Sequence, residues 1–148
     1  MRKNIKTGLI IICVSLLMVA IKSDVAVANF TSTCIIGGLN YNGVLSARCL
    51  NLEGQLVDTG IDLGRYIGSN EDGILVWQRE GRFHDQCTQR RLIPDTRRNR
   101  NITENITVLE ASCPTTNPPP ERAVSQLNLD EHIFNLDSIL RYIPGGPE

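Results

Sequence analysis

The feature that most constrains this 148-residue chain is an internal repeat, because residues of the first half recur 64 to 66 positions later. The matches are Ala47-Arg48-Cys49 with Ala111-Ser112-Cys113, Ile61-Asp62-Leu63 with Leu127-Asn128-Leu129, Ile67 with Ile133, and Trp77 with Tyr142. Each copy reads cysteine, strand, cysteine, polar loop, Leu-rich turn, Asp turn and aromatic strand. Units this short bury little surface alone, so we expect the two copies to share one core.

The apolar pattern is that of short strands. Apolar residues alternate or form short runs between Gly, Asn and Asp, and helical periodicity is weak throughout. Asp72-Gly73 precedes the run Ile74 to Trp77, which is a hairpin signal because glycine adopts the positive φ of a tight turn. Asp137-Ser138 stands at the matching place in the second copy. The pattern predicts an all-β fold.

The first 28 residues have the features of a secretory signal peptide. These are a basic start, an apolar run and a small-x-small cleavage pattern: Arg2, Lys3 and Lys6; Leu9 to Ile21; and Ala26-Val27-Ala28. A single-pass membrane anchor is the alternative, but the run is shorter than the roughly 20 residues that a bilayer core requires. We therefore expect a secreted domain of residues 29–148, with one repeat at about 29–79 and the other at about 80–148.

Four cysteines remain after this leader is removed: Cys34, Cys49, Cys87 and Cys113. An even number in an exported chain indicates disulfides, which disfavours a metal site. Of the three pairings, the repeat favours Cys34 with Cys49 and Cys87 with Cys113. On the chain-entropy model, closing a loop of about 15 residues stabilises the fold by roughly 3 kcal/mol.

An arginine-rich insertion at about 90–105 lengthens the second copy. We expect an exposed loop there, either a site for sulfated or acidic glycans or a solvated segment without a ligand. The mature chain has 11 arginines against 15 acidic residues, a net charge of −4, which disfavours nucleic acid and acidic membranes as partners. Asn101 and Asn105 begin glycosylation sequons, as does Asn29 at the new terminus.

Nothing in the sequence favours catalysis, a metal or a cofactor. His84 and His132 are the only histidines and have no nucleophile nearby in sequence. His84 and Asp85 are adjacent, and neighbouring side chains on a strand face opposite sides. Asp130 and Glu131 could serve a glycosidase, but nothing fixes the separation that such a carboxylate pair needs. For Trp77 a core position is favoured over stacking on a sugar ring. We expect a protein that is not an enzyme.

The order of motifs along the mature chain resembles the cyanovirin-N family. The motifs are Phe30-Thr31-Ser32-Thr33-Cys34, Ile61-Asp62-Leu63, Asp72-Gly73-Ile74-Leu75-Val76-Trp77, Leu127-Asn128-Leu129-Asp130-Glu131-His132-Ile133, Asn135-Leu136-Asp137 and Leu140-Arg141-Tyr142. The resemblance covers the mature chain except the insertion and Pro118-Pro119-Pro120. It implies a pseudo-symmetric β fold whose two lobes each take strands from both repeats, and a lectin for mannose-rich oligosaccharides.

The resemblance also implies one sugar site near each far end. The first would use Asn29, Thr33, Asn135 and Asp137, although Leu50 and Leu52 stand where the relative has polar groups. The second would use Arg82, Asp85, Gln86 and Thr115. In it, Arg82 and Gln86 are substitutions, and Gly68 replaces an expected acidic residue. We expect the first site to be the better one.

These features predict a secreted lectin that binds mannose-type glycans or glycoproteins without metal. The alternative is a secreted protein-interaction module of the same fold that has lost sugar binding, with the arginine-rich segment as its contact surface. The family includes monomers and domain-swapped dimers. Arg79 stands where a hinge proline promotes swapping, which favours the monomer.

Overall fold

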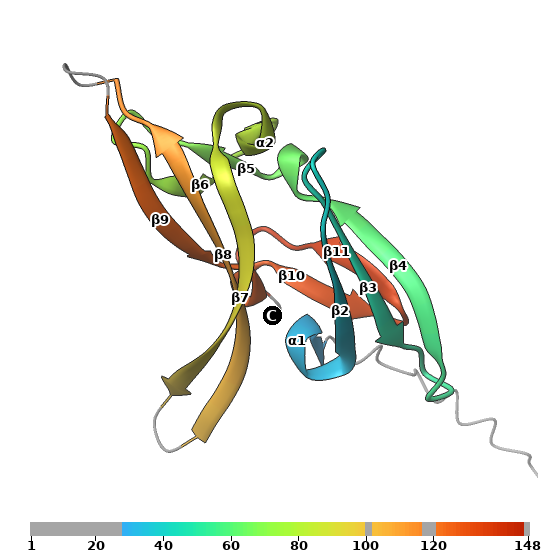
Figure 1. The fold of residues 1–148 in the computed structure, drawn as a ribbon. Coiled ribbons are helices and arrows are strands. Elements are labelled where there is room, and N and C mark those ends of the chain that lie inside the picture. Colours follow the sequence, from blue (N-terminus) through green and yellow to red (C-terminus); the bar gives the residue numbers. More distant parts are fainter. Residues whose placement is uncertain (1–27, 100–101, 117–120, 147–148) are drawn as a thin grey trace, which may run out of the picture.

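The computed structural model describes residues 28–99, 102–116 and 121–146, and they form two β lobes (Figure 1). The predicted signal peptide lies outside the described residues, apart from Ala28 at its end. No helix within the described part of the chain is long and apolar enough to cross a membrane.

The first lobe combines residues 28–62 of the first repeat with the last two strands of the second repeat. Its elements are β1 (Ala28–Asn29), α1 (Phe30–Thr33), β2 (Cys34–Leu39), β3 (Val44–Leu50), β4 (Leu56–Asp62), β10 (Ile133–Leu136) and β11 (Ile139–Tyr142). One antiparallel sheet has the order β2-β3-β4 and a second has the order β1-β10-β11. Leu140 N donates to Thr59 Oγ1 at 3.4 Å, which joins the second sheet to β4.

The second lobe mirrors this arrangement. Its elements are β5 (Ile67–Ser69), β6 (Leu75–Trp77), α2 (Phe83–Gln86), β7 (Thr88–Asn99), β8 (Ile102–Pro114) and β9 (Arg122–Asn128). The sheet β7-β8-β9 belongs to the second repeat, and the β5-β6 hairpin of the first repeat packs against it. Leu75 N donates to Ser125 Oγ at 2.8 Å across this contact. Each lobe therefore contains strands of both repeats, which confirms the exchange predicted from the family.

The disulfides and the short helices repeat in register. Cys34 is bonded to Cys49 and Cys87 to Cys113, as predicted. Two 3-10 turns, η1 (Leu63–Arg65) and η2 (Leu129–Glu131), follow β4 and β9. Asp62 Oδ1 accepts from Gly64 N, and Asn128 Oδ1 accepts from Asp130 N, so the same local cap starts both turns.

Three hairpin loops share one sequence pattern, Asn-x-x-Gly. They begin at Asn40, Asn51 and Asn70 and end on Gly43, Gly54 and Gly73, whose φ angles are 80°, 77° and 73°. In each loop the asparagine Oδ1 accepts from two backbone N–H groups, as Asn51 does from Glu53 and Gln55. Glycine is favoured at the fourth position because positive φ costs it no steric strain.

One core runs through both lobes. Its fully buried side chains include Phe30, Leu45 and Leu63 of the first repeat and Phe83, Leu109, Leu129 and Ile133 of the second. Between the repeats, Tyr66 stacks on Tyr142 with ring centroids 4.4 Å apart, and Trp77 meets His132 edge-on at 4.9 Å. This places Trp77 and His132 in the interface of the repeats, and for Trp77 it agrees with the core position favoured from the sequence.

The arginine-rich insertion is not a loop, so that prediction was wrong. Residues 90–99 continue β7 and residues 102–105 belong to β8, which gives a two-stranded ribbon that projects from the second lobe (yellow and orange in Figure 1). Between its two pairs of arginines the insertion has Leu92, Ile93 and Thr96, and it pairs with a segment rich in Ile and Thr at 102–107, a composition that suits a strand.

Candidate functional site

Three of the four residues predicted for the first site surround one small cavity. The cavity has a volume of about 140 Å³ and lies at the end of the first lobe. Its lining residues come from β1, α1, the loop after β3 and the β10–β11 hairpin: Ala28, Thr33, Leu50, Asn51, Leu52, Asn135 and Asp137. Segments that are about 100 residues apart in sequence thus meet here.

Asn135 is the fixed centre of this cavity. It is buried, and its Nδ2 donates to Thr33 Oγ1 at 3.1 Å and to the carbonyl oxygen of Leu50 at 2.9 Å. Thr33 Oγ1 in turn donates to the carbonyl oxygen of Asn29. Asn135 Oδ1 has no hydrogen-bond partner among the residues that the structure describes. Leaving a buried amide oxygen without a hydrogen bond costs free energy. A ligand hydroxyl that donates to this oxygen would recover that cost.

Asp137 forms the exposed side of the cavity. Asp137 and Ser138 have φ angles of 51° and 67°, and they connect Leu136 and Ile139 in a two-residue turn. Positive φ at both central residues is the pattern of the type I′ hairpin. One carboxylate oxygen of Asp137 accepts from Leu52 N at 2.9 Å, which holds the loop after β3 against the turn. The other oxygen has no partner in the described chain and is open to a ligand.

Leu50 and Leu52 form an apolar rim, with 39% and 65% of their surfaces exposed. The leucine side chains add no hydrogen-bonding group to the cavity, so the polar contacts of this side come from backbone groups and Asn51. Vicinal sugar hydroxyls both donate and accept, and the carboxylate, amide and hydroxyl of the opposite side are complementary to them.

Asn29, the fourth predicted residue, faces a neighbouring cleft instead. It lines a cavity of about 320 Å³ together with Ser32, Thr103, Glu104 and Asn105. Its Oδ1 is buried and has no hydrogen-bond partner in the described part of the chain. The residues of α1 are divided between the two cavities, since Ser32 lines this cleft and Thr33 lines the cavity around Asn135.

The residues predicted for the second site are engaged with the protein itself. Arg82 Nη2 lies 2.8 Å from Asp85 Oδ2, and His84 Nε2 lies 3.4 Å from Asp85 Oδ1. Gln86 Oε1 accepts from Ser69 Oγ at 3.4 Å. Thr115 exchanges hydrogen bonds with the backbone of Glu121. Asp85 and Gln86 lie in α2 and Arg82 directly precedes it, whereas Thr115 belongs to the loop after β8.

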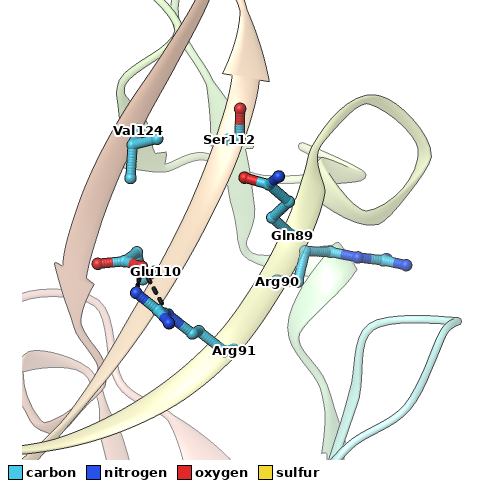
Figure 2. A pocket seen from close by; sticks show the side chains of 6 residues that line it. All are labelled: Gln89, Arg90, Arg91, Glu110, Ser112 and Val124. Carbon is cyan, nitrogen blue, oxygen red and sulfur yellow. Dashed lines mark hydrogen bonds and ion pairs between the residues drawn. The ribbon is translucent and has the colours of Figure 1, made fainter.

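A larger groove of about 540 Å³ lies on the outer face of the sheet β7-β8-β9. Figure 2 shows Arg91 reaching across to Glu110, while Arg90 points away from the groove. Arg91 Nε donates to Glu110 at 2.7 Å, and Gln126 Nε2 donates to the other oxygen at 2.8 Å. These bonds lower the pKa of Glu110, with that from Gln126 the larger cause. Arg91 and Glu110 thus pair with each other, while Arg90 donates to the carbonyl oxygens of Tyr41 and His84.

Asp130 is the centre of a buried hydrogen-bonded cluster beside α1. From the sequence it was considered only as one carboxylate of a glycosidase pair, which was not favoured. It is 8% exposed and accepts three hydrogen bonds, from Thr31 N at 3.1 Å, Thr31 Oγ1 at 2.6 Å and Thr107 N at 2.7 Å. Burial raises the pKa of its carboxyl despite these bonds. The three hydrogen bonds of the carboxylate hold α1 against β8. No group of three or more His, Cys, Asp or Glu suited to a metal occurs among the described residues.

Two repeats with exchanged hairpins, two disulfides and a polar cavity at one lobe end define a pseudo-symmetric binding domain. The model of the CVNH domain matches residues 30–141. The chain therefore belongs to the cyanovirin-N homologue (CVNH) family, as its resemblance predicted.

Solved structures agree with this assignment. The CVNH protein of Gibberella zeae is 29% identical, with a TM-score of 0.62 over 78% of this chain and 98% of that one. Microvirin, solved in complex with mannobiose, is 27% identical, with a TM-score of 0.55 over 78% and 98%. The CVNH protein of T. borchii is 23% identical, with a TM-score of 0.59 over 78% and 100%, and shows the fold alone.

Proposed function

We propose that this chain is a secreted lectin, not an enzyme, that binds mannose-type oligosaccharides without a metal at the cavity of the first lobe. The observation that carries the proposal is the convergence of Thr33, Asn135 and Asp137, which leaves one amide oxygen and one carboxylate oxygen unpartnered. Membership of a family that includes lectins supports it, as does the complex of microvirin with mannobiose.

Asp137→Asn tests the proposal with little disturbance of the fold. Asparagine tolerates the positive φ of this turn, and its Oδ1 can still accept from Leu52 N. It lacks the second acceptor oxygen and the charge. Because a hydrogen bond to a charged group contributes about 1.5–3 kcal/mol, we expect mannobiose binding to weaken by about tenfold or more in calorimetric titration.

Asp85→Asn is the matched control, since it makes the same chemical change at the corresponding end of the second lobe. It should leave mannobiose affinity within about twofold of the unchanged chain, a difference of roughly 0.4 kcal/mol. Equal losses in both variants, or no mannobiose binding by the unchanged chain, would contradict the first-lobe site.

A second candidate function is a protein-interaction module, which the exposed Leu50 and Leu52 favour. Apolar side chains at the rim of a site suit a protein partner better than a sugar. A partner captured in excess mannose and lost with Leu50→Ser/Leu52→Ser would support this function. Loss with Arg97→Ala/Arg98→Ala would instead assign the contact to the ribbon.

A further inference from the structure

The ribbon of β7 and β8 creates a cleft beside the first-lobe cavity. The cleft lies between α1 and the ribbon, and we call it the ribbon cleft. It consists of two adjoining cavities of about 320 and 550 Å³, which share Asn105. Their lining residues are Asn29, Thr31 and Ser32 on one side, and Pro94, Asp95, Thr96, Thr103, Glu104, Asn105 and Ile106 on the other.

We propose that the ribbon cleft is a second subsite of the first-lobe sugar site and holds further neutral sugar units of an oligosaccharide. The inference rests on the proposed lectin function. It assigns a role to the insertion, namely to make the protein select longer or branched neutral glycans over disaccharides.

The two sites are continuous because one short segment forms a wall of both. Ala28 and Thr33 line the cavity around Asn135, whereas Asn29, Thr31 and Ser32 line the ribbon cleft. These residues occupy β1 and the single turn α1, so a chain of sugars can pass over this turn from one site to the other. Asn29 Oδ1, buried and without a partner, offers an acceptor on the cleft side.

The lining of the cleft suits uncharged hydroxyl-rich ligands. Hydroxyl and amide groups come from Ser32, Thr96 and Asn105, and carboxylates come from Asp95 and Glu104. Arg97, which lies next in sequence to Thr96, is directed to Glu131 at 4.0 Å. In the ribbon Arg97 is opposite Glu104 and Arg98 is opposite Thr103, but neither arginine lines the two cavities, whereas Asp95 and Glu104 do. Carboxylates in the lining disfavour sulfate and carboxylate groups. The proposal therefore differs from the acidic-glycan interpretation of the insertion, and the sulfated tetraose in the experiment below distinguishes the two.

The base of the cleft is held rigidly. Thr31 Oγ1 lies 2.8 Å from Thr107 Oγ1, and both threonines donate to Asp130. These bonds connect α1, β8 and η2 at Thr31, which lines the cleft. A cleft with fixed walls binds sugars at a smaller entropic cost than a flexible loop would.

The predicted glycosylation residue Asn105 lies within this cleft, and its side chain is exposed. Thr107 of the same sequon is only 2% exposed, so transferase access would have to precede folding. A glycan on Asn105 would fill the cleft. The other predicted residue, Asn101, lies outside the described residues. The test therefore uses disulfide-intact protein from the bacterial periplasm, where no eukaryotic N-glycan is attached.

Asn105→Tyr fills the cleft with a large side chain, and tyrosine suits a strand. Arg98→Tyr is the control, because it makes the same kind of change on the same ribbon at a residue that does not line the cleft. Calorimetry compares mannobiose, a neutral mannotetraose and a sulfated tetraose. We expect the unchanged chain and Arg98→Tyr to bind mannotetraose at least about tenfold more tightly than mannobiose. Asn105→Tyr should lose this gain and bind mannobiose unchanged. The sulfated tetraose should show no gain in any variant.

Different outcomes separate this inference from the proposed function. If mannobiose binds but mannotetraose binds no better, or if Asn105→Tyr keeps the gain, the subsite is overturned while the lectin function stands. A gain with the sulfated tetraose overturns the neutral specificity. If the unchanged chain binds none of the sugars, the lectin function fails and the inference fails with it. Circular dichroism checks that both variants are folded.

Discussion

The two lobes use one framework to hold a short helix against a sheet, but they use different chemistry at matching positions. In the first lobe, Thr31, Asp130 and Thr107 form a hydrogen-bonded cluster. The repeat places His84, Gly64 and Gly43 at the corresponding positions of the second lobe. There, a methyl group added to Gly64 would overlap the ring of His84, and one added to Gly43 would lie 3.0 Å from it.

The difference shows that the repeat conserves shape more strictly than polarity. A polar triad fills the space in one lobe, and an imidazole ring packed on two glycines fills it in the other. Phe30 and Phe83 are equally buried beside the two clusters. The polar version is found next to the sugar cavity and the ribbon cleft, where α1 supplies walls to both. We infer that the lobes share a scaffold and that only the first developed a site.

Among the changes that compare the two lobes, removal of a disulfide should have the largest effect on the free energy of unfolding. We expect Cys34→Ala/Cys49→Ala and Cys87→Ala/Cys113→Ala each to lower the free energy of unfolding by about 2–5 kcal/mol. The bridged cysteines are 15 and 26 residues apart, and the longer loop predicts a loss about 0.5 kcal/mol larger in the second lobe. Urea unfolding measures both values. A negligible loss for either pair would show that its bridge does not destabilise the unfolded chain as the loop-closure model requires.

Gly64→Ala tests the packing of the second lobe. The added methyl group overlaps the His84 ring, so we expect a loss of about 1–3 kcal/mol. In the background of His84→Ala the same change should cost less than about 0.5 kcal/mol, because the ring is gone. Thermal unfolding of the four proteins gives this coupling energy. Equal costs in both backgrounds would show that the ring does not set the requirement for glycine.

Asp130→Asn tests the polar cluster of the first lobe. An amide can accept from only one side, so a backbone N–H of Thr31 or Thr107 loses its partner, at a cost of about 1–3 kcal/mol. Because burial raises the pKa of Asp130 above its ordinary value of 3.8, folding favours the protonated form. Stability from this carboxyl is therefore fully present below its unfolded pKa and is lost as pH rises through the folded pKa.

Urea unfolding of the unchanged chain and Asp130→Asn between pH 3 and 7 measures this dependence. The stability advantage of the unchanged chain should shrink as pH rises through the raised pKa. An advantage that grows with pH would contradict the assigned cause.

Ser138→Gly should have the smallest effect, and it acts on the hairpin that carries Asp137. Ser138 has a φ of 67°, which glycine adopts without strain, as Gly73 does in the hairpin of the other lobe. We expect a gain of about 0.5–1 kcal/mol with unchanged mannobiose affinity. Chemical unfolding and calorimetry measure the two quantities. A loss of stability would show that the turn depends on the serine side chain.

Most of the fold could be predicted from the sequence, because repeated framework residues carry it. Cys49 and Cys113, or Leu63 and Leu129, can be matched by offset alone, and they fix the disulfides and the core. The exchange of hairpins between lobes could be inferred only from the family. It depends on long-range contacts such as that between Leu75 and Ser125, which no local pattern encodes.

The site was predicted less completely. Thr33, Asn135 and Asp137 were found, but the side to which Asn29 turns depends on the helical turn α1, which the strand pattern did not predict. The ribbon was missed because a run of arginines was interpreted by charge, whereas cross-strand pairing of residues 91–99 with 102–110 decides its structure. The Asn-x-x-Gly loops could have been predicted from the sequence, since the pattern recurs at Asn40, Asn51 and Asn70.

The central claim is that one lobe end, and not its symmetric counterpart, carries the sugar site. An NMR titration of the ¹⁵N-labelled, disulfide-intact chain with mannobiose tests it residue by residue. We predict that the amide signals of Thr33, Asn135 and Asp137 shift first and saturate together, while those of Arg82, Asp85 and Gln86 stay in place at the same sugar concentration. Shifts that begin at α2 of the second lobe, or no shifts in either lobe, would contradict the account.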